Sequence, residues 1–104
     1  MAKVKATFFL PLRDNDGRDL RPEIRGAEVE LYSAFVGFTR MGVVTGAYVM
    51  TDGTRSDDEL MSYFLMLDEE RIPELREVLT RFKGKTTQEA IYFELQYNTV
   101  IDFI

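Results

Sequence analysis

The chain of 104 residues contains no cysteine, no histidine and no tryptophan. The absence of cysteine excludes disulfides, thiolate chemistry and cysteine-based zinc sites. The absence of histidine removes the usual general base near neutral pH and the commonest metal ligand. Any metal would therefore have to be a hard cation held by carboxylate and carbonyl oxygens. We expect a protein without cofactors, located in the reducing cytoplasm.

Basic residues are also scarce relative to acidic ones. Lys and Arg number 13 against 18 Asp and Glu, which gives a formal net charge of -5. This balance opposes binding to nucleic acid or to an anionic membrane, because phosphate contacts need clustered cations. The N-terminal MAKVKATFFLPLRD has too short an apolar run for a signal peptide or a membrane span. We expect a soluble protein with neither nucleic acid nor membrane as a partner.

The length predicts a single domain over residues 1–104. An apolar content of 45% with 30% charged residues is that of a folded globular chain. The most apolar long stretch runs from Phe35 to Met50, and a turn signal, Thr51-Asp52-Gly53-Thr54, follows it. Together with the second apolar run, Leu60 to Leu67, it predicts a central β-hairpin. The connection from Thr51 to Glu59 is long for a hairpin and predicts an exposed acidic tip.

Helices and strands flank this hairpin. Alternating apolar residues predict a first strand over Lys3 to Pro11 and another over Ala90 to Tyr97. Helical spacing predicts a helix opened by Pro22 and a second with Asp68 as N-cap candidate and Gly84 at its end. The predicted buried stripes are Ile24, Ala27, Leu31, Ala34 and Phe35, and then Ile72, Leu75, Val78, Leu79 and Phe82. Glu77 and Arg81 are spaced for an ion pair.

The order strand, helix, strand, strand, helix, strand predicts an α+β, ferredoxin-like βαββαβ sandwich. Its four-stranded antiparallel sheet would carry two helices on one face, and Val100 to Ile104 could add a short fifth strand. Leu60 to Leu67 is apolar on both parities, so the second face also needs cover. We therefore expect a homo-oligomer, a homodimer first and a trimer as the alternative.

Three segments carry a family resemblance: PLRDNDGRDL (11–20), FVGFTRMGVVTGAY (35–48) and TTQEAIYFEL (86–95). In this order they resemble a group of small bacterial proteins of unassigned function, similar in architecture to ferredoxin-like, PII-type regulatory domains. The resemblance spans roughly residues 4 to 97. In that group residues 36–39 more often include paired glycines, and the position of Tyr48 more often holds tryptophan. The resemblance implies a fold and brings no established chemistry.

Several residues are candidates for a ligand site. Arg40, between Gly37 and Gly42, could supply charge to an anion-binding loop, although the glycines also fit a β-bulge. Polar groups on or beside the strands could line a pocket on the bare sheet face: Tyr48, Gln88, Glu89, Tyr92 and Glu94. Ordinary cross-strand pairing explains them as simply. Asp14, Asp16, Gly17 and Glu23 partly match a calcium loop, but Leu12 occupies its first position, so a plain turn is the simpler interpretation.

These observations favour a non-enzymatic, oligomeric ligand-binding or regulatory domain that takes a small molecule. The alternative is a small cofactor-free enzyme, isomerase- or lyase-like, with a Tyr/Glu site between subunits or on the sheet face. A metal-dependent nuclease, or another protein that binds nucleic acid through the sheet, fits the acidic charge poorly.

Overall fold

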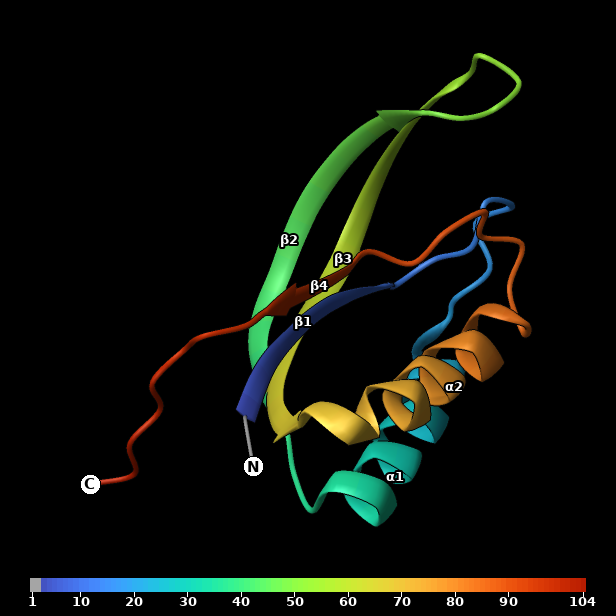
Figure 1. Cartoon of the computed structure of the whole chain (residues 1–104). Helices are drawn as coiled ribbons and strands as arrows, with labels where there is room; N and C mark the ends of the chain where they lie inside the picture. The colour runs from blue at the N-terminus through green and yellow to red at the C-terminus, as the bar shows by residue number, and fades with distance from the viewer. Residues whose placement is uncertain (1–2) are drawn as a thin grey trace.

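The structure, a computed structural model, describes residues 3–104 and has an α+β fold of one sheet and two helices (Figure 1). The elements are β1 (Lys3–Pro11), α1 (Arg21–Phe35), β2 (Thr39–Val49), β3 (Arg55–Asp68), the 3-10 turn η1 (Glu69–Arg71), α2 (Ile72–Lys83) and β4 (Phe93–Gln96). The four strands are antiparallel in the order β2-β3-β1-β4. This order confirms the predicted ferredoxin-like sandwich.

Both helices cover the same face of the sheet (Figure 1). Alternate strand residues on that face, among them Phe8, Tyr63 and Leu65, are buried against the two predicted helical stripes. Phe8 and Tyr63 face each other across β1 and β3, with ring centroids 5.4 Å apart. Burying these side chains is the main favourable contribution to the free energy of folding, at roughly 25 cal/mol per Å² of apolar surface.

Local chemistry sets the limits of the helices. Pro22 and Pro73 lie in the first turns of α1 and α2, where a missing N–H costs no hydrogen bond. Arg81 and Lys83 in the last turn of α2 complement its dipole. Within residues 3–104, neither helix combines the length and apolar character needed to cross a membrane.

The central hairpin is confirmed, but its predicted connection is too long. β3 begins at Arg55, and Val49 pairs with Arg55, so the turn occupies only residues 50–54. The polar residues 55–59 form a strand because β2 offers a full set of pairing groups opposite them. β1 reaches only Leu60, which it pairs through Pro11. The hairpin therefore projects past the other two strands (Figure 1).

The bulge interpretation is confirmed at Gly42, whereas Gly37 precedes β2. The pairing of β2 with β3 shifts register between Arg40 and Gly42, and Gly42 has a φ of 106°, in the region that favours glycine. The last predicted strand is shorter than expected, Phe93–Gln96 in place of Ala90 to Tyr97.

The expected fifth strand is wrong for the described chain. Residues 97–104 have no strand assignment, and they leave the sheet as an extended tail (Figure 1). The reason lies at Asn98, whose φ of 57° turns the backbone away from β4. The tail leaves Val100 and Phe103 largely exposed, at 87% and 85%.

Two predicted local contacts are replaced by tertiary ones. Asp68 makes no capping bond with its side chain and instead pairs with Lys3 at 2.8 Å. Arg81 pairs not with Glu77 but with Glu30 of α1 at 2.7 Å. In both cases a partner from another element competes successfully with the sequence neighbour.

Candidate functional site

The sheet face that carries no helix is the natural place for a site. We call it the open face. The strand register identifies its residues, because they alternate along each strand with the residues of the buried core. They are Phe9 and Pro11 of β1, Leu60, Phe64 and Met66 of β3, and Val44 and Tyr48 of β2. Leu60, Phe64 and Met66 are half-buried there without helix cover. β3 is thus apolar on both sides, as predicted.

A cleft of about 520 Å³ lies on the open face, where the hairpin projects past β1. One wall is the hairpin, with Val44, Tyr48 and Leu60, and the other is the segment 88–92 that precedes β4. Phe9 and Pro11 complete the lining. We call this the open-face cleft. Its volume is within the range of small-molecule sites, roughly 300–1,000 Å³.

Glycine shapes the floor of this cleft. Gly46 lies opposite Asp58 in the hairpin ladder. A Cβ at Gly46 would stand 3.2 Å from Cδ1 of Leu60, closer than side chains normally pack. The glycine therefore leaves room for Leu60 to line the cleft.

The two walls are joined at one end by Thr51 and Glu89. The Thr51 hydroxyl donates to Oε1 of Glu89 at 2.7 Å, and the Thr51 amide donates to the same oxygen at 3.4 Å. These residues are 38 positions apart in the sequence. The contact holds the hairpin end beside the segment 88–92 and so bounds the cleft.

Polar groups gather at this end of the cleft. The side chain of Ser56 donates to Oδ1 of Asp58 at 3.0 Å, whereas Oδ2 of Asp58 is buried and accepts no hydrogen bond from the described residues. Burial, reinforced by the neighbouring Asp58 carboxylate, raises the pKa of the Tyr48 hydroxyl. Tyr48 therefore keeps its proton at neutral pH and is a hydrogen-bond donor facing carboxylates.

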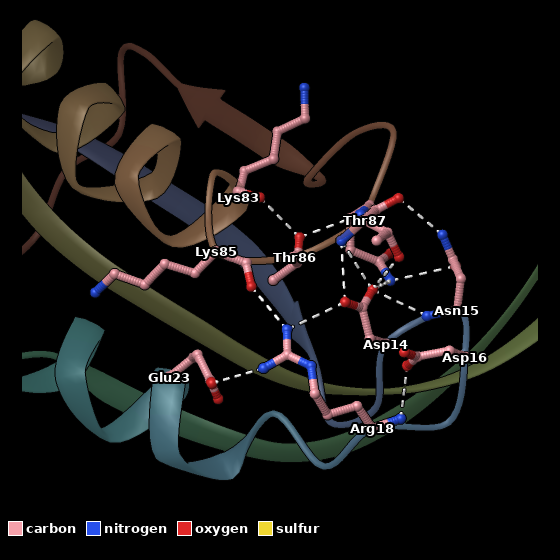
Figure 2. A network of polar contacts seen from close by, with 10 residues as sticks. Asp14, Asn15, Asp16, Arg18, Glu23, Lys83, Lys85, Thr86 and Thr87 are labelled. Carbon is pink, nitrogen blue, oxygen red and sulfur yellow. Dashed lines mark hydrogen bonds and ion pairs between the residues drawn. The ribbon is translucent and has the colours of Figure 1, made fainter.

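A polar network behind the cleft fixes the segment that forms its second wall (Figure 2). The Asp14 carboxylate accepts hydrogen bonds from the Thr87 amide at 3.0 Å, the Thr87 hydroxyl at 2.6 Å and Nε2 of Gln88 at 3.2 Å. Arg18 bridges the same carboxylate, at 3.3 Å, and the carbonyl of Lys85, at 2.7 Å. These bonds tie the turn after β1 to residues 85–88.

The environment of Asp14 stabilises its charge. Only 6% of Asp14 is exposed, and burial alone would raise its pKa. Hydrogen bonds from Thr87, Asn15 and Gln88 outweigh the burial and lower the pKa to about 2. Asp16, by contrast, accepts from the amide of Arg18 at the exposed turn. Residues 14–16 thus form a structural turn, in which protein donors satisfy the Asp14 carboxylate.

The structure brings two of the four residues named as ligand-binding candidates into the cleft. Tyr48 lines the hairpin wall, and Tyr92 lines the other, where its ring stacks on Phe9 with centroids 4.5 Å apart. Gln88 and Glu89 join them. Glu94 faces Thr7 across β4 and β1, outside the cleft lining.

Arg40 lies elsewhere, at the start of β2 near α1. Its Nε and one terminal nitrogen donate to the two oxygens of Glu28 at 2.8 and 2.7 Å. The buried Tyr63 hydroxyl also donates to Glu28, at 2.6 Å. The bonds from Arg40 lower the pKa of Glu28, and burial together with Glu28 raises the pKa of Tyr63. In this position Arg40 joins α1 to the sheet, and its guanidinium is paired with the Glu28 carboxylate.

Sequence reasoning missed Asp58, Val44 and Leu60 as cleft residues. Val44 and Leu60 entered the prediction only as members of the two apolar runs of the central hairpin, and Asp58 was placed in the hairpin connection. Residues 55–59 are all polar, so no alternation in the sequence marks the start of this strand. Only its pairing with β2 reveals it, and that register puts Asp58 on the same face as Tyr48.

A second cleft, of about 490 Å³, adjoins the first and shares Asp58. It lies between the turn after β1 and the start of β3, and its lining is strongly charged, with Arg13, Arg55, Asp57 and Glu59 among others. Within residues 3–104, no group of three or more Asp or Glu side chains is arranged to hold a metal ion.

No protein-family model matches the chain. A search of curated proteins by sequence finds no match either. Among solved structures, the chain is similar to the divalent ion tolerance protein CutA1 from Ehrlichia chaffeensis, with a TM-score of 0.63 and 8% sequence identity. The match covers 98% of this chain and 87% of that chain. At this identity the likeness establishes the fold, a ferredoxin-like α+β sandwich, and no shared chemistry.

Proposed function

We propose that this protein is a non-enzymatic ligand-binding domain of regulatory, PII-like type, whose ligand site is the open-face cleft. The observation that carries the proposal is the cleft itself: apolar walls from Val44, Leu60 and Tyr92, with polar groups gathered at one end. Clefts of this composition and size are the usual form of small-molecule sites. The Asp14 network supports the proposal because it fixes the second wall independently of any ligand.

Self-association is the second part of the proposal. Val49, at the end of β2 and outside the cleft lining, is 66% exposed, and the tail residues Val100 and Phe103 are more so. Exposed apolar surface of this kind favours association, and a closed symmetric assembly is the commonest outcome. We propose a homodimer, with a trimer as the alternative, in the cytoplasm.

Two other roles receive less support. The enzymatic alternative would use Tyr48 with a carboxylate, but the arrangement around Tyr48 accounts for binding without a chemical step. The description of CutA1 names divalent ion tolerance. We do not extend that role to this chain, since the residues from 3 to 104 offer no cluster of three carboxylates to a cation.

A dye titration tests the binding proposal. Nile red, which is uncharged and fluoresces more strongly in apolar surroundings, should bind the wild-type protein. Val44→Gln places a polar amide on the cleft wall and should weaken binding about tenfold. Val43→Gln is the matched control, because Val43 is the neighbouring exposed valine on the opposite side of β2.

The control should bind the dye as the wild type does. The proposal is wrong if the wild-type protein does not bind the dye, or if both variants lose affinity equally. Light scattering on the same samples gives the mass of the assembly, and an unchanged mass in Val44→Gln shows that the lost affinity comes from the cleft.

A further inference from the structure

We infer that the open-face cleft takes an organic cation, a molecule with an ammonium head and an aromatic or branched apolar body, whose head lies at the end of the cleft formed by Asp58 and Glu89. This inference rests on the proposed ligand-binding function and names the class of ligand.

The charge of the cleft is the first argument. The described residues that line it include Asp58 and Glu89 but no lysine or arginine. None of the ion pairs formed among residues 3–104 includes either carboxylate. The nearest basic side chain in the sequence, Arg55, has the opposite parity in β3 and lines the neighbouring cleft. The open-face cleft thus holds negative charge without a matching cation.

Unused acceptors are the second argument. The Asp58 carboxylate faces the Tyr48 hydroxyl, and its buried Oδ2 makes no hydrogen bond of ordinary length and angle with the described residues. Glu89 uses Oε1 for Thr51, and Oε2 takes no part in the hydrogen bonds found among the described residues. Because Oδ2 of Asp58 is closed to solvent, Oε2 of the exposed Glu89 is the acceptor that a ligand can reach, and a charged N–H donor is the partner that stabilises a carboxylate most.

The walls are the third argument. Phe9 and Tyr92 stack with an interplanar angle of 12°, and Tyr48 faces them from the hairpin side of the cleft. Aromatic faces attract organic cations as well as apolar groups. Val44 and Leu60 supply aliphatic surface for the body of the ligand. An inorganic cation would use none of this surface, and an anion would face Asp58 and Glu89 at close range.

Three indole compounds test the class directly. Tryptamine carries an ammonium, tryptophol replaces it with a hydroxyl, and indoleacetate replaces it with a carboxylate. The protein contains no tryptophan, so the indole fluorescence anisotropy of each compound reports its binding without background. At a constant salt concentration of about 0.15 M, which screens the net charge of the protein, tryptamine should bind about tenfold more tightly than tryptophol. Indoleacetate should bind most weakly.

Two variants assign the preference to the site. Asp58→Asn keeps the size of the side chain but removes its charge, and should weaken tryptamine binding about tenfold while leaving tryptophol unchanged. Asp57→Asn is the matched control, because it makes the same change of charge one residue away on the other side of β3. It should change neither affinity.

The outcomes separate the two proposals. If tryptophol binds as tightly as tryptamine and both displace Nile red, the cation class is wrong and the cleft remains a ligand site. If Asp57→Asn weakens tryptamine as much as Asp58→Asn does, the preference comes from the overall charge and the inference is overturned. If tryptamine, tryptophol and Nile red all fail to bind, the proposed function fails together with the inference. Should Asp58→Asn fail to fold, the comparison of the three compounds on the wild-type protein still decides.

Discussion

Replacing Asp14 with asparagine should destabilise the protein by about 2 kcal/mol at neutral pH, although Asp14 lies in a turn. Its pKa is lowered from 3.8 to about 2, which corresponds to about 2.4 kcal/mol of preference for the charged form in the folded state. Hydrogen bonds to a charged group contribute roughly 1.5–3 kcal/mol in mutational studies. The two figures agree because the same donors, led by Thr87 and including Asn15 and Gln88, cause both effects.

The loss should depend on pH in one direction. Since the folded-state pKa of Asp14 lies below its unfolded value, its stabilisation is complete above about pH 4 and is lost as the pH falls toward 2. The difference in unfolding free energy between wild type and Asp14→Asn should therefore shrink over that window. Urea denaturation followed by circular dichroism at several pH values measures it.

Asp16→Asn is the control for this experiment. Asp16 lies in the same turn and makes a single hydrogen bond at the exposed surface, to the amide of Arg18. Its replacement should change the unfolding free energy by no more than about 0.5 kcal/mol. The reasoning is refuted if Asp14→Asn costs less than that, or if its cost stays the same down to pH 2. Because Asp14 fixes residues 87 and 88, its variant should also weaken dye binding to the open-face cleft.

Other predictions follow from the core, the tail and the surface charge. Leu75→Ala should destabilise the fold by about 2–5 kcal/mol, because Leu75 is fully buried under the sheet; in chemical denaturation, a loss below about 1 kcal/mol would contradict this packing. Removing the tail after Asn98 should dissociate the oligomer, so that light scattering gives a smaller number of chains per particle. An unchanged number of chains and an unchanged stability would show that the tail takes no part in self-association. Nucleic-acid binding should be absent or feeble at physiological salt, given the net charge of -5, and a salt-sensitive mobility shift at micromolar protein would contradict that.

The fold could be predicted from the sequence because its pattern is redundant. The periodic stripes of Ile24 to Leu31 and Ile72 to Phe82, the alternation in β1 and the turn signal at Asp52-Gly53 all indicate the same order of elements. Two of the three differences between the predicted and observed strands have one kind of cause. The strand beginning at Arg55 forms because its partner strand is present, and the tail leaves the sheet at the positive φ of Asn98. Neither the pairing of β3 with β2 nor the φ angle of one residue can be predicted from the residue types of the segment itself.

The site was only partly predictable. Tyr48 and Tyr92 were candidates for the bare sheet face because they lie on or beside predicted strands, and both line the cleft. Arg40 was proposed for its charge and its neighbouring glycines, but Glu28 of α1, 12 residues away, binds its guanidinium. Asp14 was interpreted as a turn residue, and its contact with Thr87 spans 73 positions. Long-range hydrogen bonds leave no periodic signal in a sequence, so charged residues are the ones whose roles were misjudged.

The central claim is that the open-face cleft is a ligand site. Amide chemical shifts of the isotope-labelled protein, recorded during a titration with tryptophol, test it directly because the probe is neutral and independent of the charge argument. We predict saturable shifts for Gly46, Leu60 and Ile91, which line the cleft, with the amides of α1 and α2 unchanged. Shifts confined to the helices or to the charged second cleft, or no saturable shifts at millimolar probe, would contradict the account.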